Sequence, residues 1–569
     1  MFAFFSEASN NSTSAEASVV LEPIRAAGLL DAEGLTSLPQ IAAQCGGLLP
    51  AFLVVVVSVA FRKGLAEQLF GERRQRRKDT VGVGARNKER EITYADFQVN
   101  GKGKGEGEVA EAYRKKHGMK CESDALWIAI HGKVYDITDF ADTHPGGDVI
   151  RSMVGRDASD VFMAFHMPRV QQRLPPMCVG VLTEAPPAKP ATRDYRQLRE
   201  RLWQEGMFDC DLDYQLGRDA IAAAIFALGL CAILCGASPA VRVGVGGIAV
   251  GVALQQVAFT AHDAGHRGVV HPKAGGNFNW WGWLHGTVLF GVSAEMWLCE
   301  HSAHHALTME PCEDPQFNYL PLWLVSKKEL ARLSERNIAE RTLARLLVPI
   351  QHFTMIPLSM IIGRFNLHAI SICWILKHLR HRPRILVAEL LGFALYFTWF
   401  GYVVSLLPVV DTPPPATAAA VDDADAWSLG TLLASERFWF LMVSYVTAGI
   451  LHIQLTISHL ALDAFTAAEE EAEQFVYHQL KTTRNINTSW WDDWFHGGLQ
   501  YQIEHHLFPQ LPRHNLARVK PLVMELCQKN GIKYESVGFW AAISYCLADF
   551  KRLSYFISDV VRPDEIAGC

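Results

Sequence analysis

Long apolar stretches alternate with polar loops throughout the second half of this chain. Length and lack of charge predict four membrane-spanning helices, at residues 219–236, 239–259, 385–409 and 437–460. Two further stretches, at 277–298 and 347–375, are apolar but interrupted by polar residues, which favours interfacial or re-entrant helices. Most of the tryptophans near 280–297 are expected in an interfacial belt, and the alternative is that they line an apolar substrate tunnel. The pattern predicts an all-α polytopic membrane domain at 211–520 and a cytosolic tail at 521–569.

The first 79 residues are predicted to be a leader rather than a folded domain. They include one apolar run, residues 46–61, which is shorter than the ~20 residues that a span usually needs. Basic residues follow this run and would stay in the cytosol, so the run is a candidate for an additional membrane anchor. A targeting segment that is later removed, or a disordered leader, is the alternative interpretation.

Charge asymmetry predicts the orientation of the membrane domain. The loop from Asp411 to Asp425 carries no Lys or Arg, whereas basic residues cluster at 377–384, just before the third predicted span. Because basic loops stay on the cytosolic side, the 377–384 end is expected to face the cytosol. The histidine clusters described below then all fall on that side.

The composition is consistent with a soluble part joined to a membrane part. Half of the 569 residues are hydrophobic, and a net charge of -6 gives no indication of nucleic-acid binding. The 12 cysteines form no CxxC pair and no disulfide-like framework. Such cysteine usage fits soluble parts that face the reducing cytosol.

A pair of histidines marks a candidate haem site within residues 80–186. His144 lies in the run HPGG, and His166 follows a helical stretch. Two neutral imidazoles can clamp one iron from opposite faces, while the two glycines let the backbone approach a flat ring. HPGG, the preceding VYDITDF and the later GRDASDVFMAFH resemble a cytochrome b5 domain. The resemblance implies an α+β fold that binds haem b through His144 and His166. The prolines of the segment 186–190 indicate a linker to the membrane domain at residues 187–210.

Three histidine clusters indicate a second kind of metal site. They are His262-Asp263-Ala264-Gly265-His266, His301-Ser302-Ala303-His304-His305 and Gln502-Ile503-Glu504-His505-His506. On a helix these spacings place the imidazoles of each cluster on one face. Each cluster adjoins a long apolar stretch, and imidazole suits iron, copper and zinc. The clusters therefore predict a metal site at a membrane boundary.

The order of these clusters between membrane spans resembles the membrane fatty-acid desaturase and hydroxylase superfamily. A glutamine at the start of the third cluster, the signature from Trp494 to Pro509 and the fused cytochrome b5 segment are typical of its front-end desaturases. The resemblance implies a centre of two non-haem irons that activates O2. The ligands that it implies are His262, His266, His301, His304, His305, His505 and His506. His459 matches the position of a further histidine ligand, while Gln502 would bind directly, bind through water or orient a neighbour.

The same resemblance implies an oxidoreductase that inserts a cis or trans double bond into a long-chain, polyunsaturated fatty-acyl substrate, carried on a lipid or on CoA. O2 is the expected co-substrate, and electrons are expected to pass from an NADH-cytochrome b5 reductase through the haem. Desaturation of a sphingoid base at carbon eight and lipid hydroxylation are the alternatives, and the double-bond position stays open. The expected location is the endoplasmic reticulum membrane with a cytosolic catalytic face, and a plastid membrane is less expected.

Overall fold

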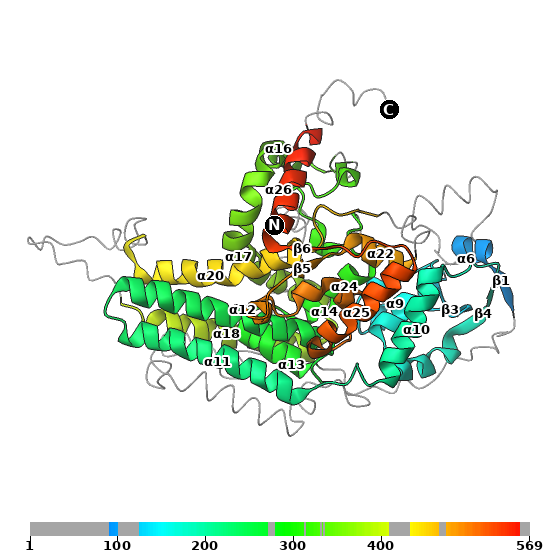
Figure 1. The fold of residues 1–569 in the computed structure, drawn as a ribbon, viewed down its shortest axis with the longest axis horizontal. Helices are drawn as coiled ribbons and strands as arrows, with labels where there is room; N and C mark the ends of the chain where they lie inside the picture. The colour runs from blue at the N-terminus through cyan, green and yellow to red at the C-terminus, as the bar shows by residue number, and fades with distance from the viewer. Residues whose placement is uncertain are drawn as a thin grey trace, which may run out of the picture.

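The computed structural model describes residues 90–100, 125–270, 279–311, 314–330, 333, 336–408, 433–465 and 474–557. A small sheet-containing part lies at one end of the molecule, and long helices extend away from it toward the other end (Figure 1). The helices that carry the second and third histidine clusters lie between these two regions (Figure 1). The candidate anchor at 46–61, the acidic loop at 411–425 and the chain beyond residue 557 lie outside the described residues.

The sheet-containing part is built from short strands and short helices. Strands β1 (Glu91–Thr93), β2 (Trp127–Ile130), β3 (Lys133–Asp136) and β4 (Cys178–Thr183) form a sheet in the order β1-β4-β3-β2. β1 is parallel to β4, and the other neighbours are antiparallel. The helices are α6 (Tyr94–Asn100), η1 (Ala141–Thr143), α8 (Val149–Ser152), α9 (Ser159–Phe165), η2 (Pro168–Arg173) and η3 (Pro175–Met177). Ile128, Ile130 and Tyr135 are buried in its core, and the predicted α+β fold is confirmed.

Residues 187–210, which the sequence suggests as a linker, consist mostly of helix α10 (Pro190–Gln204). Its proline stands at the first helical position, where the missing N–H costs nothing. Tyr195 and Leu202 are fully buried against the C-terminal helices α22 (Phe475–Thr482) and α25 (Arg513–Lys529). The two parts of the chain are therefore joined by a packed helix.

Four apolar helices form the bundle: α11 (Leu212–Cys235), α12 (Gly246–Gly265), α18 (Pro383–Ser405) and α20 (Glu436–Thr456), with the π-helical turn η4 (Ala240–Val245) leading into α12. Each is long and apolar enough to cross a membrane, which confirms the four predicted spans as helices. α12 is the most buried of them and packs against both α11 and α20. Gly251 permits the contact with α20, because a Cβ there would lie 2.6 Å from the carbonyl oxygen of Ser444.

A fifth apolar helix, α17 (Gln351–His378), runs across the direction of the other four (Figure 1). It follows α16 (Ile338–Leu347) and η8 (Val348–Ile350), and it packs beside α26 (Phe539–Ser554). By length and composition it is also long enough to span a bilayer. Phe353 on this helix is 71% exposed. An exposed apolar side chain fits a lipid-facing span as well as an interfacial helix, so the interfacial interpretation of residues 347–375 stays a prediction.

The interrupted apolar stretch at 277–298 folds into the interior. It forms α13 (Trp280–Gly282), the π-helical η5 (Trp283–Phe290) and the start of α14 (Ala294–Ala306). The indole of Trp283 donates a hydrogen bond to the carbonyl oxygen of Ala388 at 2.8 Å, and Trp281 stacks on His285. Both indoles are buried, so the expected interfacial belt is wrong for these two residues.

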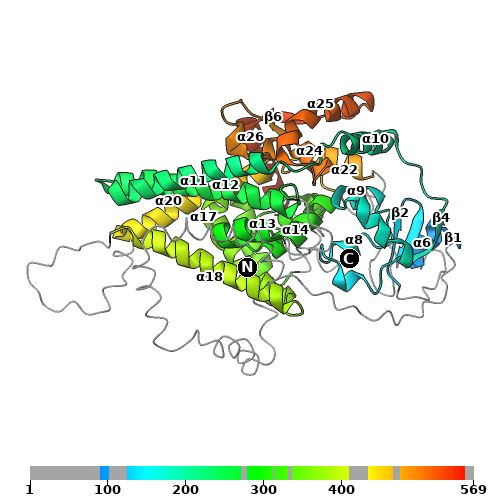
Figure 2. The same cartoon turned by 90° about the horizontal axis from the view of Figure 1, so that it is seen from below.

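The C-terminal segments cover the end of the bundle that faces the sheet-containing part. Two turns, η6 (Pro315–Phe317) and η7 (Lys327–Glu329), follow α14. Later in the chain, α20 leads to the C-terminal elements, which are α22, β5 (Asn485–Asn487), α23 (Asp493–His496), η10 (Leu499–Tyr501), α24 (Gln502–Leu507), α25 and β6 (Ser536–Gly538). β5 and β6 pair in parallel. Helices α10, α22, α24 and α25 lie together on one side of the molecule (Figure 2). This arrangement brings the third histidine cluster to the ends of α12 and α14.

Candidate metal centres

Eight histidines from separate elements meet at one end of the bundle. α12 supplies His262 in its last turn and His266 directly after it, α14 supplies His301, His304 and His305, and α24 supplies His505 and His506. His459 lies just after α20. Their ligand nitrogens form two groups, five residues in one and three in the other, and within each group they lie within 4.8 Å of one another.

The first group contains His262, His266, His301, His305 and His505. The Nε2 atom of His301 lies 2.9 Å from that of His262 and 3.1 Å from that of His305. Nε2 of His266 and Nε2 of His505 are buried with no hydrogen-bond partner. Several nitrogens that face one another without enough hydrogens to share are satisfied by a metal ion. The donor set of this group therefore fits a metal.

The second group contains His304, His459 and His506. The amide nitrogen of Gln502 lies 3.2 Å from Nε2 of His459 and 3.2 Å from Nε2 of His506, while its amide oxygen is buried without a partner. Amide oxygen and nitrogen exchange places by a simple flip, which would turn the oxygen toward the same space. Gln502 is therefore positioned as a fourth donor for this group.

Ring contacts connect the two groups. His305 belongs to the first group, and its imidazole stacks on that of His506 in the second, with ring centroids 4.0 Å apart. α14 contributes histidines to both groups because its i, i+3, i+4 spacing places them along one face. The two groups thus form one continuous histidine cluster.

A second layer of side chains holds the Nδ1 atoms. A carboxylate oxygen of Asp314 lies 2.9 Å from Nδ1 of His304, and the amide oxygen of Gln479 lies 2.8 Å from Nδ1 of His506. The amide nitrogen of Gln316 lies 2.9 Å from Nδ1 of His301, and the carbonyl oxygen of Thr482 lies 3.0 Å from Nδ1 of His459. The oxygen acceptors at His304, His459 and His506 fix the tautomer, so that Nε2 of these three rings is left as the donor to a metal.

Burial keeps several of these imidazoles neutral. The pKa of His301, His305 and His506 is lowered well below its usual value, first because burial disfavours the charged form and then because neighbouring histidines oppose a second positive charge. Neutral imidazole is the form that binds metal. At neutral pH these three rings are therefore in the form that binds a metal.

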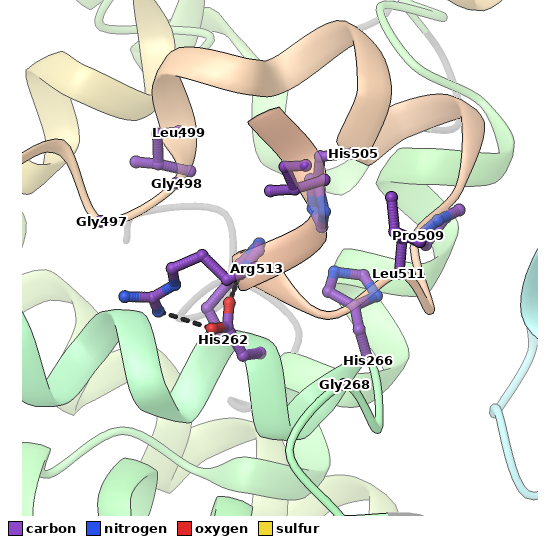
Figure 3. A pocket seen from close by; sticks show the side chains of 12 residues that line it. His262, His266, Gly268, Gly497, Gly498, Leu499, His505, Pro509, Leu511 and Arg513 are labelled. Atoms are coloured by element: carbon purple, nitrogen blue, oxygen red, sulfur yellow. Dashed lines mark hydrogen bonds and ion pairs between the residues drawn. The ribbon is translucent and has the colours of Figure 1, made fainter. Parts of the chain in front are cut away.

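A small cavity lies beside the first group (Figure 3). Its volume is about 10 Å³, room for one water-sized molecule. His262, His266 and His505 line it, together with the loop at Gly497. Arg513 closes it through an ion pair of 2.7 Å with Asp263, drawn as a dashed line in Figure 3. The cavity is thus bounded by donor residues on one side and by an ion pair on the other.

The second candidate site lies in the sheet-containing part. The ring centroids of His144 and His166 are 6.1 Å apart, which leaves a gap for one metal atom between them. Nδ1 of His144 donates to the carbonyl oxygen of Gly147 at 3.1 Å, and Nδ1 of His166 donates to that of Phe162 at 3.0 Å. A Cβ at Gly146 would lie 2.8 Å from Cε1 of His144, so this turn has no room for a side chain. The pair fits the bis-imidazole ligation of a haem.

Comparison with known families agrees with both sites. Residues 111–183 match the model of the cytochrome b5-like haem/steroid binding domain, and residues 237–538 match the model named fatty acid desaturase. The second match covers more than half of the chain and spans every histidine of the two groups.

The chain belongs to the fatty acid desaturase family.

Curated relatives share both parts of this desaturase. The Delta(8)-fatty-acid desaturase 1 of Arabidopsis thaliana is 32% identical over 454 residues, which cover 79% of this chain and 94% of the relative. The Acyl-lipid (9-3)-desaturase of Borago officinalis is 29% identical and covers 77% of this chain and 92% of the relative. The Delta 8-(E)-sphingolipid desaturase of Komagataella phaffii is 34% identical over 301 residues, about half of each chain. This chain is therefore a front-end membrane desaturase, an oxidoreductase with a fused haem-binding domain.

The sequence predicted which residues form the two histidine groups of this desaturase, but not the neighbouring residues that contact their Nδ1 atoms. All the candidate ligands, including His459 and Gln502, lie in or against the two groups. Asp314 and Gln316 were visible only as the flank of the second cluster. Gln479 gave no signal, because it lies 27 residues before His506 and contacts it only through the fold.

Proposed function

We propose that this desaturase binds two non-haem irons, one in each histidine group. His262, His266, His301, His305 and His505 would hold the first, and His304, His459 and His506, with Gln502, the second. The observation that carries this proposal is the convergence of buried imidazole nitrogens, with Nδ1 of His304, His459 and His506 already facing an oxygen acceptor. A protein that only binds lipid would not need such a set of buried imidazoles.

When bound, the irons would supply the O2-dependent chemistry that removes hydrogens from an unactivated methylene, which side-chain acids and bases cannot do. The residues of this chain contribute the geometry. Neutral imidazoles hold the cations without adding negative charge near lipid, and Asp314 and Gln479 fix the orientation of two rings. His144 and His166 would hold haem b, which carries the required electrons one at a time.

We propose a long-chain fatty-acyl group as the substrate, with the new double bond near its carboxyl end. The names of the Arabidopsis and Borago relatives support this choice. A sphingoid base with a double bond at carbon eight is the second candidate, supported by the Komagataella relative. Each relative named above is a desaturase, which favours desaturation over the hydroxylation that the histidine clusters alone would permit.

We further propose that the histidine end of the bundle faces the cytosol at the endoplasmic reticulum, where an NADH-cytochrome b5 reductase would reduce the haem. The basic residues at 377–384, at the histidine end of α18, support this orientation. The proposed division of the chain keeps residues 80–186 as the haem domain and 211–520 as the membrane desaturase domain.

The test is lipid analysis of yeast that expresses the full chain and is fed separately with polyunsaturated fatty acids. A new fatty acid lighter by two hydrogens, unsaturated near the carboxyl end, would support the fatty-acyl proposal. A new unsaturated sphingoid base would replace it with the second candidate. If haem-loaded and iron-loaded protein makes neither product, both substrate proposals are contradicted.

A further inference from the structure

The haem-binding part is fixed against the histidine cluster along the length of helix α9. Arg196 of α10 forms a two-pronged ion pair with Asp160, at 2.7 and 2.9 Å. Arg199 donates to the carbonyl oxygen of Met163, and the amide of Gln510 donates to that of Phe165 at 2.6 Å. Three side chains from the desaturase side thus hold successive parts of one short helix.

The two parts also share an apolar core. Ala306 and Leu307, which directly follow His305 at the end of α14, are fully buried in the same cluster as Ile128 and Met153 of the haem-binding part. Gly147, beside the haem ligand His144, approaches α14 so closely that a Cβ would lie 2.7 Å from the Sγ of Cys299. The docking is therefore a packed interface, and the relative position of the two metal sites is fixed.

Phe165 lies in this interface, beside the histidine cluster. It precedes the haem ligand His166 in the chain, and its ring meets the ring of His305 edge-to-face, with centroids 6.3 Å apart. Through this contact, the residue next to the haem ligand His166 touches a histidine of the metal cluster, His305. His305 in turn stacks on His506 and so touches both groups. A chain of packed atoms runs from His166 through Phe165 to all the proposed iron ligands.

We propose that Phe165 is the positioning residue for electron transfer from the haem to the histidine cluster, an inference that rests on the two-iron function proposed above. In each transfer, one electron leaves the reduced haem, which is oxidised from ferrous to ferric, and one iron at the histidine cluster is reduced by that electron. No bond forms or breaks, and two transfers serve each double bond. The aromatic ring fills the gap between the sites and shortens the distance over which the electron must pass without intervening atoms.

The proposal is tested on the full-length, haem- and iron-loaded protein by stopped-flow spectroscopy. The haem is reduced chemically and mixed with air-saturated buffer that contains a lipid substrate, and its reoxidation is followed at the Soret band. Phe165→Leu should slow reoxidation about tenfold, equal to about 1.4 kcal/mol in activation free energy. It should leave the haem spectrum, the haem midpoint potential, the iron content and the KM for lipid unchanged. Phe165→Tyr, which keeps the ring, should retain the rate.

Phe140→Leu is the matched control, because Phe140 packs against the other haem ligand, His144, and makes no described ring contact with the histidine cluster. It should reoxidise like the wild type. If Phe165→Leu loses haem, Phe165→Met, whose unbranched side chain of similar volume adapts more readily to the site, replaces it. Full-rate reoxidation in the haem-loaded Phe165 variant, or equal slowing in Phe140→Leu, would overturn the role of Phe165.

A further variant separates this inference from the proposed function. His304→Ala should remove the iron-dependent part of haem reoxidation, whatever the state of Phe165. If wild type and His304→Ala reoxidise at one rate, the histidine cluster accepts no electrons, and the proposed two-iron function itself is overturned. If only the Phe165 effect is missing, the function stands and the route is wrong.

Discussion

The two metal sites of this desaturase are built in opposite ways. Both haem ligands lie in one small domain, and each Nδ1 is held by a backbone carbonyl within four residues of its own ring. The proposed iron ligands come from α12, α14, α24 and the turn after α20, and the Nδ1 atoms of His301, His304 and His506 contact side chains that are distant in the sequence. The haem site therefore depends on local folding, whereas the iron site depends on the assembly of the whole bundle.

The largest expected effect comes from removing one proposed iron ligand while the haem site is left unchanged. His304→Ala should abolish desaturation, because His304 is a central member of the second group, while the haem spectrum should stay intact. Lipid analysis together with the Soret spectrum measures both. His378→Ala, at an exposed position near the end of α17, is the control and should be fully active. An active His304→Ala enzyme would contradict the ligand assignment.

The converse change removes a haem ligand and leaves the histidine cluster unchanged. His144→Ala should remove the haem and, with it, the internal electron supply, but leave the membrane domain folded and its iron bound. Haem absorbance, iron content and thermal unfolding of the membrane domain test this. A variant that keeps a normal haem spectrum would show that His144 is not a ligand. A variant that loses iron as well would show that the two sites are not independent.

A smaller effect is expected from the second layer of the iron site. Asp314→Asn keeps the size of the side chain but removes the charge that faces Nδ1 of His304. It should lower iron affinity or activity about 10- to 100-fold. Metal analysis and product yield are the measurements, with the exposed Asp213→Asn as control. Unchanged iron content and activity would rule out an orienting role for Asp314.

The smallest effect concerns the interface between the two regions. Asp160→Asn weakens the ion pair with Arg196, which is about one-third exposed, so the expected loss of stability is only about 1 kcal/mol or less. Thermal unfolding followed at the haem band would detect it. Asp142→Asn, at an exposed residue that pairs with Arg151 inside the haem-binding part, should have no effect on docking. Haem reoxidation that is lost in Asp160→Asn would mean that this one ion pair controls docking.

The contrast between a locally folded haem site and an assembled histidine cluster explains which residues could be assigned from the sequence. His144 and His166 were predictable because the motif, the turn and the ligands are adjacent in the chain. The four spans were predictable from composition, but hydropathy does not distinguish an indole that faces lipid from one that faces protein, and Trp281 and Trp283 proved to be buried. Likewise, the prolines before residue 190 suggested a linker, whereas Pro190 begins a packed helix. Asp314 and Gln479 could not be assigned, since only the assembled fold brings them to their histidines.

The shared core at the end of α14 limits how freely the two halves of this enzyme can be exchanged. Ala306 and Leu307 pack with the haem-binding part, while the preceding turn of the same helix holds His304 and His305. A haem domain expressed alone would expose an apolar patch where these residues now pack, and a desaturase without it would expose the other side of the same seam. Replacing the haem domain by that of a relative therefore requires a matching surface on α9 as well as a matching haem pocket.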